Sequence, residues 1–288
     1  MSVLDKSLRQ VFKGISWQNK YVIPVIKALD VPDWAIRQVK GRDYLPPYSI
    51  RVRSDGVTGQ LGGSRFDYFG GVTAGLLVNL AELTSVDRVL EIGCGSGRTA
   101  LALTKILAPG HYTGVDIDLP SIEASQKNKR LRSSDFAFAH IDVHNPMYNP
   151  QGKTSSTAYK FPLEDESVDV IFLISVFTHM LPEEVDHYIQ EISRLLKPGG
   201  RCLLSTFIMD YGHEGKIVSF PFERESYRLH VETLPEKAVG YPQRFFDDSF
   251  AAANMTLHRQ ALGDWRAFEI EAPTVDFGQD VLVFEKGV

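Results

Sequence analysis

Three glycines, Gly93, Gly95 and Gly97, alternate at the end of an apolar run in the stretch "VLEIGCGSGR". Glycines in such a turn let the backbone bend sharply and let a ligand approach without a Cβ in the way. The following residues predict a helix, and the first N–H groups of a helix suit either a carboxylate or a phosphate. The glycine spacing alone therefore leaves open which anion the turn binds.

Two neighbours of this glycine turn narrow the choice. Arg98 stands where a dinucleotide-binding fingerprint would place its third glycine. Glu91 precedes the first glycine, and a carboxylate at that point would repel a pyrophosphate but attract an ammonium group. The turn thus favours a ligand with a carboxylate, an ammonium group and no phosphate, which is an amino acid attached to a further group.

Acidic residues at the ends of the next two predicted strands indicate what that further group is. Asp116, in "GVDI", can accept hydrogen bonds from both hydroxyls of a ribose. Asp142, in "HIDVHN", can bond an adenine amino group while Val143 packs on the ring. Together with the turn, these residues describe S-adenosylmethionine (SAM).

Strands and helices that alternate along the middle of the chain must position these residues. Apolar runs predict strands at 88–93, 111–117, 136–143, 167–176 and 201–208, and helical patterns fall at 75–83, 98–107, 119–131 and 181–196. Such alternation predicts an α/β fold with a mostly parallel sheet and helices on both faces. Ligands of these sheets bind outside the carboxyl ends of the strands.

The remaining segments flank or interrupt this pattern. We expect an N-terminal segment over 1–75, with a short helix near 17–29 interrupted by Pro24 and a loop or short hairpin over 41–71. The main domain would cover 76–288, with an aromatic insert at 208–246. A helix at 247–255, with Asp247 or Asp248 as its N-cap, and strands at 256–263 and 279–286 would complete it.

These motifs together resemble the class I SAM-dependent methyltransferases. "VLEIGCGSG" is similar to the first motif of that family, "VDI" to its ribose-binding acid and "IDV" to its adenine site. "FPLEDESVDVIFLISVFTHM" resembles the fourth-strand motif, and "LLKPGG" precedes strand five. The resemblance covers roughly residues 76–207 and implies a Rossmann-like sheet of seven strands, with SAM as cofactor and S-adenosylhomocysteine as product.

The resemblance also implies a role for individual residues of the cofactor site. Glu91, Gly93 and Gly97 would lie around the methionine part, while Cys94 and Gly95 complete the turn. The other implied contacts are Asp116 with the ribose, Ile117, Asp142 and Val143 with the adenine, and Ser175 and Val176 with the methionine and sulfonium end. Asp116 and Asp142 have the alternative interpretation of turn or cap acids.

His179, in "SVFTHML", is the candidate catalytic residue. It follows the fourth strand, and an imidazole can take a proton from a phenol or ammonium acceptor at neutral pH. The alternative is a structural histidine that caps the next helix or bonds a carbonyl. Many methyltransferases of this class work without a general base, so the resemblance does not require one.

Candidate substrate residues come from the two segments outside the alternating pattern. Tyr44, Tyr48 and Arg51 in the N-terminal segment could grip an acidic group, and Tyr211 in the insert could contact the acceptor. The alternative in both segments is aromatic packing alone. "HIDVHN" offers His140, Asp142 and His144 to a metal, but Asp142 already has a cofactor role, so we expect no metal site.

Composition restricts the class of protein. The chain has 288 residues and a net charge of −5, which argues against binding nucleic acid through a broad basic face. No apolar run is long enough to span a bilayer, and the first residues lack the apolar core of a signal peptide. The two cysteines, Cys94 and Cys202, predict buried thiols in a reducing compartment, with the cytoplasm as the default location.

The sequence therefore predicts SAM-dependent methyl transfer to an O or N atom of a small molecule, with secondary metabolites and sugars as the acceptor classes considered. The tetrapeptide after the fourth strand is "SVFT" rather than the "NPPY" type of amino-methylating nucleic-acid enzymes. A SAM-binding protein of the same fold with non-methyl chemistry, or with no turnover, is the main alternative. A nicotinamide oxidoreductase is disfavoured by Glu91 and Arg98, and the oligomeric state stays open.

Overall fold

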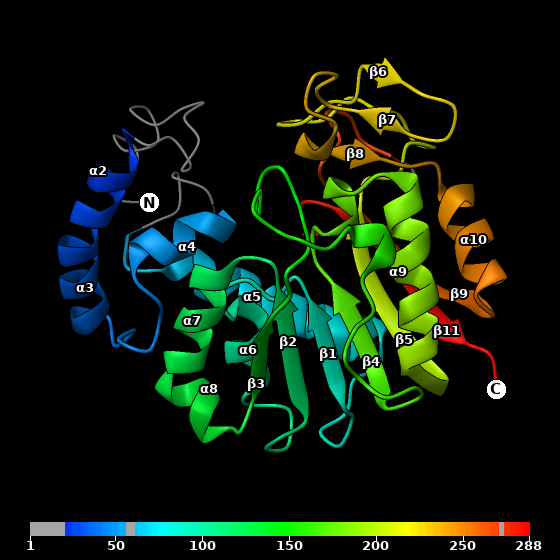
Figure 1. The fold of residues 1–288 in the computed structure, drawn as a ribbon. Helices are drawn as coiled ribbons and strands as arrows, with labels where there is room; N and C mark the ends of the chain where they lie inside the picture. The colour runs from blue at the N-terminus through cyan, green and yellow to red at the C-terminus, as the bar shows by residue number, and fades with distance from the viewer. Residues whose placement is uncertain (1–20, 56–60, 271–273) are drawn as a thin grey trace. The chain divides into compact units, whose positions relative to one another are not determined.

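A computed structural model describes residues 21–55, 61–270 and 274–288 of the chain (Figure 1). The chain divides into two compact units. The first combines residues 1–75 with 94–140, and the second combines 76–93 with 141–288. Each unit has its own buried residues and is described separately.

The first unit contains two parallel strands and a set of short helices. Strands β2 (Tyr112–Asp116) and β3 (Ala137–His140) pair in parallel, with Asp116 opposite His140. Its helices are α2 (Ile23–Ala28), α3 (Asp30–Val39), α4 (Tyr48–Asp55), the first part of α5 (Ser64–Leu80), α6 (Arg98–Leu103), α7 (Leu119–Lys127) and α8 (Lys129–Ser133). Asn128 separates α7 from α8, because its side chain accepts hydrogen bonds from the first N–H groups of α8.

Helices α2, α3 and α4 enclose a small apolar core of their own. Val22, Ile26, Tyr48 and Val52 are buried together in it. Pro24 lies in the first turn of α2, where a missing N–H costs no hydrogen bond, so the expected short helix is present.

The loop or hairpin predicted over 41–71 is wrong, because α4 and the start of α5 occupy much of it. The buried carboxylate of Asp33 stabilises helix α4, although this helix carries polar residues. Asp33 of α3 accepts from Arg37 and from Arg51 of α4, with the Arg51 Nη2–Asp33 Oδ1 distance at 2.6 Å. Arg51 lies 18 residues from Asp33, so local patterning could not reveal this pairing.

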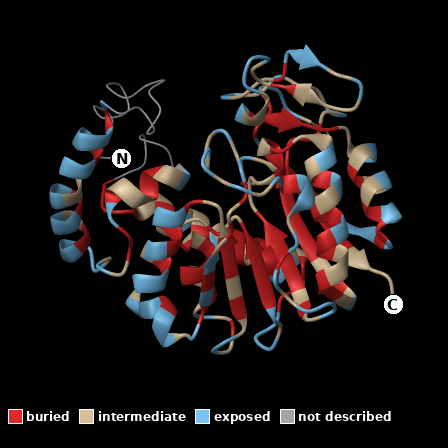
Figure 2. Ribbon diagram, viewed as in Figure 1, coloured by how far each residue is buried: buried red, intermediate tan, exposed pale blue. Residues whose placement is uncertain are grey.

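The second unit contains the larger part of the strands. They lie in the order β10-β9-β11-β5-β4-β1. Their bounds are β1 (Val89–Ile92), β4 (Val168–Leu173), β5 (Leu196–Thr206), β9 (Met255–Gly263), β10 (Thr274–Val275) and β11 (Asp280–Lys286). The β1, β4 and β5 strands are parallel neighbours, and β11 runs antiparallel to both β5 and β9. Figure 2 shows these central strands mostly buried.

The α/β class and the mostly parallel pairing are as predicted. Outside the small sheet of the insert, the described residues have two strands in the first unit and six in the second, one more than the seven expected. The addition is the two-residue β10, which pairs with the end of β9. Strand β3 is shorter than predicted and stops at His140 rather than at 143, whereas β5 is longer and begins at Leu196 rather than at 201.

Two longer helices accompany these strands in the second unit. They are α9 (Pro182–Leu195) and α10 (Gln243–Ala252), and α9 begins with Pro182 in its first turn. Helix α10 starts about one turn earlier than predicted, with Pro242 rather than Asp247 or Asp248 at the N-cap. The short 3-10 turns η1 (Ser156–Ala158), η2 (Phe177–His179) and η3 (Pro235–Lys237) complete the helical elements.

The insert after β5 forms a small sheet with its own core. Strands β6 (Phe222–Glu223), β7 (Arg228–Leu229) and β8 (Val239–Gly240) pair antiparallel. Phe207, Phe220 and Trp265 are buried together and make close ring contacts. Part of the aromatic content of the insert therefore serves packing, the alternative that the sequence left open.

A buried carboxylate connects three segments at the base of this insert. Asp280 of β11 accepts from the Ile208 and Gly263 N–H groups, from Trp265 Nε1 and from Arg266. The side chains of Asp280 and Arg266 are both almost completely buried. Such a pair is strongly destabilising when only one partner is removed.

Among the described residues, none of the helices combines the length and the apolar character needed to cross a membrane.

Candidate functional site

The first unit brings together the second half of the glycine turn and the acid after β2. Gly95 and Gly97 both have positive φ, and Gly97 is the left-handed N-cap of α6. The Gly95 N–H donates to Asp116 Oδ2 at 2.6 Å, and the Cys94 N–H donates to the Val115 carbonyl. A Cβ on Gly95 would lie 2.9 Å from Ser54 Oγ, so the end of α4 lies close to this turn.

The Asp116 carboxylate is held by two backbone donors. In addition to Gly95, the Asp118 N–H donates to Asp116 Oδ1 at 2.7 Å. Burial raises the pKa of Asp116 to about 6, although both N–H donors act in the opposite direction. A carboxylate has about four acceptor positions, so two remain for other donors. The adjacent Ile117 is tied to β3, because His140 Nε2 donates to its carbonyl at 3.1 Å.

Asp118 is a second carboxylate at this turn, and the sequence analysis did not assign it. It caps α7 by accepting from Ser121, and it receives two donors from Arg53 of α4, with Nε–Oδ2 at 2.6 Å. The pair links the N-terminal segment to the loop after β2 within this unit. The second acid of "GVDID" was the available signal, but its partner is far away in the sequence.

The second unit holds Glu91 and Gly93 at the end of β1. Glu91 is 3% exposed and lies opposite Phe172 in the pairing of β1 with β4. Gly93 has a φ of +79°, and a Cβ there would lie 2.5 Å from Val176 Cγ2. The structure thus places Gly93 against Val176, two of the residues assigned to the methionine end.

Ser175 lies in a strained conformation just after β4. Its φ is +59°, an uncommon value for a residue with a side chain. The Ser175 N–H donates to Ser205 Oγ, and Ser175 Oγ donates to Gln279 Oε1 at 2.9 Å. Ser205 also donates to the same oxygen of Gln279, at 2.5 Å. Ser205 and Gln279 carry no recognisable motif, so sequence reasoning missed them.

Asp142 and Val143 follow β3 in a loop of the second unit. The Asp142 carbonyl accepts from the Thr154 N–H, and Val143 is buried. No hydrogen bond to the Asp142 carboxylate is present within the described part of the chain. The loop therefore fixes the backbone at Asp142 while the carboxylate is available to a ligand.

His179 lies in η2, where its ring contacts the insert. Nδ1 is 2.8 Å from the Glu236 carbonyl oxygen of η3, and Tyr148 makes an edge contact with the ring. Because a carbonyl only accepts, Nδ1 carries the hydrogen, and Nε2 is unprotonated in the neutral ring. Burial lowers the pKa of His179 below its ordinary value, which keeps the ring neutral at pH 7.

The candidate substrate residues fall in different environments. Tyr48 and Arg51 are almost completely buried in the N-terminal helices, where Arg51 pairs with Asp33. Tyr44 donates to Asp67 and lies under the Arg130 guanidinium. Tyr211 of the insert is 43% exposed and lies near Arg266. The structure therefore gives Tyr48 and Arg51 structural roles.

No cluster of three or more metal-ligating side chains is found among the residues that the structure describes.

Comparison with known families identifies the part of the chain that carries these motifs. Residues 90–204 match a family model described as a methyltransferase domain. The matched segment starts in β1, contains the glycine turn and Asp116, and ends within β5. Over these residues the chain is similar to a methyltransferase domain. The cofactor of this family is S-adenosylmethionine, and S-adenosylhomocysteine is its product.

Curated relatives share part of the methyltransferase domain and act on different acceptors. A "tRNA N(3)-cytidine methyltransferase METTL2" from Gallus gallus is 37% identical over 174 residues, which are 58% of this chain and 42% of the relative. A "Phthiotriol/phenolphthiotriol dimycocerosates methyltransferase 1" from Mycobacterium ulcerans is 33% identical over 116 residues, 40% of this chain and 36% of the relative. The chain spans less than half of the length of either relative.

A solved structure shares the fold of the methyltransferase domain. It is CalS10, described as an amino pentose methyltransferase from Micromonospora echinaspora with SAM bound. Its TM-score is 0.51 at 13% identity, over 78% of this chain and 92% of that chain. The named relatives support a SAM-dependent enzyme. They do not support the argument from net charge against a nucleic-acid substrate, since one of them is named for tRNA.

Proposed function

We propose that the methyltransferase domain transfers the methyl group of SAM to an O or N atom of a small-molecule acceptor. The observation that carries the cofactor assignment is the Asp116 carboxylate, which two N–H groups fix after β2 while leaving acceptor positions for two ribose hydroxyls. The family match over 90–204 supports the same cofactor.

The residues that would hold SAM are those that the sequence motifs assign. Gly95, Gly97, Asp116 and Ile117 belong to the first unit. Glu91, Gly93, Asp142, Val143, Ser175 and Val176 belong to the second. Bound SAM supplies an activated methyl group on a sulfonium, so the protein has mainly to align the acceptor and exclude water. The strained Ser175, held through Ser205 and Gln279, would line the methionine end.

His179 would act as the general base for an acceptor that must lose a proton. Its Nδ1–H is engaged by the Glu236 carbonyl, which leaves Nε2 as the proton acceptor. The lowered pKa keeps this nitrogen unprotonated at neutral pH. In this role Nε2 would take up the proton of the acceptor, and bound SAM would supply the methyl group.

The acceptor class has a second candidate. Similarity to a tRNA N(3)-cytidine methyltransferase over 58% of the chain favours an RNA base, whereas the mycobacterial relative is named for lipid-like acceptors. Transfer of tritiated methyl from SAM to size-fractionated cell extract would separate the two candidates. Label in material of low molecular mass that resists ribonuclease supports the small molecule, and ribonuclease-sensitive label supports RNA.

Thermal unfolding tests the cofactor before any acceptor is known. A ligand at about 100 times its Kd adds about 2.7 kcal/mol to the free energy of unfolding, a shift of several degrees. We expect SAM and S-adenosylhomocysteine, but not NAD, to raise the midpoint. No shift with either sulfur ligand, in folded protein free of copurified cofactor, would overturn the proposal, and a shift with NAD alone would indicate an oxidoreductase.

A further inference from the structure

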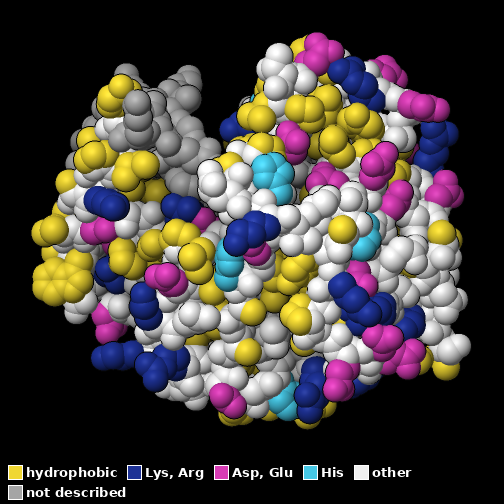
Figure 3. Space-filling model, viewed as in Figure 1, with side chains coloured by type: hydrophobic (Ala, Val, Ile, Leu, Met, Phe, Trp, Pro, Cys, Tyr) yellow, Lys and Arg dark blue, Asp and Glu magenta, His cyan; other side chains and the backbone are white. Residues whose placement is uncertain are grey.

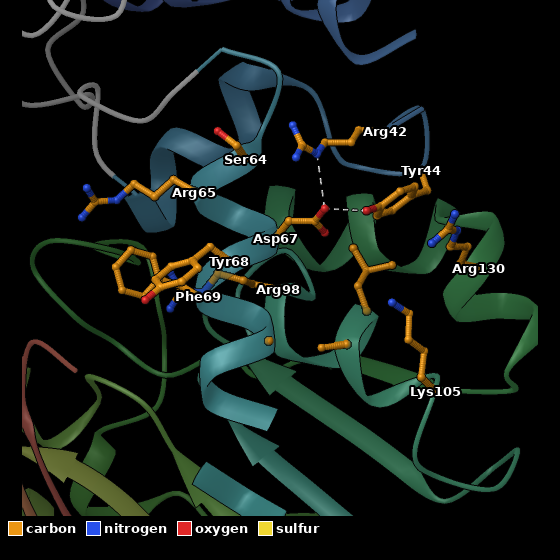
Figure 4. Close-up of a pocket in the computed structure, with 13 residues that line it drawn as sticks. Arg42, Tyr44, Ser64, Arg65, Asp67, Tyr68, Phe69, Arg98, Lys105 and Arg130 are labelled. Carbon is orange, nitrogen blue, oxygen red and sulfur yellow. Dashed lines mark hydrogen bonds and ion pairs between the residues drawn. The ribbon is translucent and has the colours of Figure 1, made fainter. Parts of the chain in front are cut away.

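A basic pocket of about 800 Å³ lies in the first unit. The loop before α4, the start of α5, one side of α6 and the start of α8 form its walls (Figure 4). None of the residues assigned to SAM lines it. Its size is within the range of pockets that hold small organic ligands.

Cationic side chains dominate the walls of this basic pocket. They are Arg42, Arg65, Arg98, Lys105 and Arg130, and they face a single carboxylate, Asp67. This excess of positive charge occurs in a chain with a net charge of −5. On the face drawn in Figure 3, by contrast, basic and acidic side chains are interspersed. The pocket therefore selects for an anion against the overall charge of the protein.

The one carboxylate of the pocket is already engaged by neighbours. Asp67 Oδ2 accepts from the Tyr44 hydroxyl at 2.6 Å and lies 3.4 Å from Arg42 Nε. Burial, with Asp67 as a further cause, raises the pKa of Tyr44 to about 12, so its hydroxyl keeps its proton. Figure 4 shows Asp67 between these two side chains. Most of the positive charge is thus not neutralised by this carboxylate.

Aromatic rings hold several of the guanidinium groups in place. Arg130 Cζ lies 3.5 Å from the centre of the Tyr44 ring. Arg65 Cζ and Arg98 Cζ lie 4.9 Å and 5.8 Å from the centre of the Phe69 ring. Such cation–π contacts orient a guanidinium group. Tyr68, which packs edge-on against Phe69, is 53% exposed and offers a ring face to a planar ligand.

We infer that this basic pocket binds a nucleotide unit, with its phosphates on the arginine and lysine side chains and its base against Tyr68. Planar guanidinium groups suit phosphate oxygens, and an exposed aromatic ring suits a base. The same chemistry is offered by a free nucleotide and by one residue of a single-stranded RNA. The inference does not depend on methyl transfer or on SAM binding.

Binding of three probes to the full chain tests the inference. They are inorganic tripolyphosphate, uridine diphosphate and a fluorescent single-stranded oligouridylate, titrated at several salt concentrations. We expect tripolyphosphate and the diphosphate to bind, and the diphosphate to lose affinity in a Tyr68→Ala variant while tripolyphosphate does not. Binding of neither small probe nor of the RNA would overturn the inference.

Matched variants locate the bound phosphates. Lys105→Gln and Arg130→Gln each remove one exposed cation of the pocket, and Lys129→Gln removes the neighbouring exposed cation that does not line it. We expect roughly three- to tenfold weaker binding in the first two variants, with no change in the third. For the RNA probe, Lys105→Gln and Arg130→Gln should each also reduce the slope of log binding constant against log salt concentration by about 0.7. Equal behaviour of all three variants would place any binding outside the pocket and refute the assignment.

The source of the nucleotide follows from the same titrations. An RNA that binds at least tenfold more tightly than the diphosphate, with a steeper salt slope, supports a polynucleotide ligand. Equal affinities support a free nucleotide or a nucleotide-linked small molecule. Because these measurements contain no SAM, their failure would leave the proposed methyl transfer unaffected, and failure of SAM binding would leave the pocket unaffected.

Discussion

Replacing Asp116 by asparagine is the sharpest test of the cofactor site. The variant keeps the size of the side chain but removes its charge, and one of its two polar atoms becomes a donor. In the wild-type chain, both carboxylate oxygens accept a backbone N–H, from Gly95 and from Asp118. An asparagine can accept only one of these, so the side chain loses both acceptor strength and its fixed orientation.

The size of the effect follows from the hydrogen bonds that remain available. Two acceptor positions of Asp116 are left for the two ribose hydroxyls, and a hydrogen bond to a charged group contributes about 1.5–3 kcal/mol. Losing about 2 kcal/mol would raise the Kd for SAM roughly 30-fold. Burial of the negative charge raises the pKa of Asp116, and the asparagine variant no longer carries the cost of burying this charge. We therefore expect little change in the stability of the unliganded protein.

The pH dependence of SAM binding gives an independent measurement on the wild-type chain. With a pKa of about 6, about one tenth of the Asp116 carboxyls are ionised at pH 5 and about nine tenths at pH 7. The ribose hydroxyls donate to the ionised form, so affinity should rise about tenfold between these pH values, with proton release on binding. In the unliganded protein the folded state binds the Asp116 proton more tightly than the unfolded chain does. The contribution of Asp116 to the free energy of unfolding therefore falls as pH rises from about 4 to 6.

Isothermal titration of SAM and S-adenosylhomocysteine, from pH 5 to 7.5, measures both effects. Asp43→Asn, an exposed acid of the same unit, is the control variant. Asp116→Asn should bind weakly and without the pH dependence seen in the wild type. Wild-type affinity in a folded Asp116→Asn variant would refute the assignment of Asp116 to the ribose. A flat pH profile in the wild type would refute the link between its titration and binding.

Three further predictions concern other parts of the site. On an acceptor that must lose a proton, His179→Ala should reduce kcat at least about 100-fold and leave SAM affinity unchanged. Because the pKa of His179 is lowered, wild-type kcat should fall only at a pH below the ordinary range of histidine. An equal loss of SAM affinity in the variant would indicate a structural role. Gly93→Ala should lower the free energy of unfolding, measured in urea, by about 2 kcal/mol or more. The reason is that the new Cβ would lie 2.5 Å from Val176 and that the φ of this residue is positive. An unchanged unfolding midpoint would contradict this prediction. Arg53→Gln should increase hydrogen exchange in α4, since it removes the paired donors to Asp118, while exchange in α10 stays the same as an internal reference.

The sequence was sufficient for the seven longer strands and for the order of the cofactor motifs, but not for the two-residue strands β6, β7, β8 and β10. The run "VIFL" is apolar throughout and "VLEI" is apolar apart from Glu91, and these runs form the core of β4 and the buried β1. The family match confirms the interpretation of the motifs between residues 90 and 204. The contacts that the motifs would make with SAM stay predictions.

Contacts between distant residues could not be predicted in the same way. Helix α4 is polar at Arg51 and Arg53, and it is stabilised by Asp33 and Asp118, which lie in other parts of the chain. The same reason hid Gln279, 104 residues from Ser175, and the basic pocket, whose cations come from four separate segments. Single-sequence patterns report which face of an element is buried, whereas pairing of charges depends on the tertiary fold.

The buried Asp280 has a consequence for how this family of chains can diversify. Its carboxylate fixes the N–H of Ile208, where the insert begins, and anchors the segment after β9 through Trp265 and Arg266. An inserted segment with a fixed point of departure is free to change its length and its side chains without disturbing the strands beneath it. The insert also supplies the Glu236 carbonyl that orients His179, so an exchange of residues 209–246 between homologous enzymes has to keep this contact.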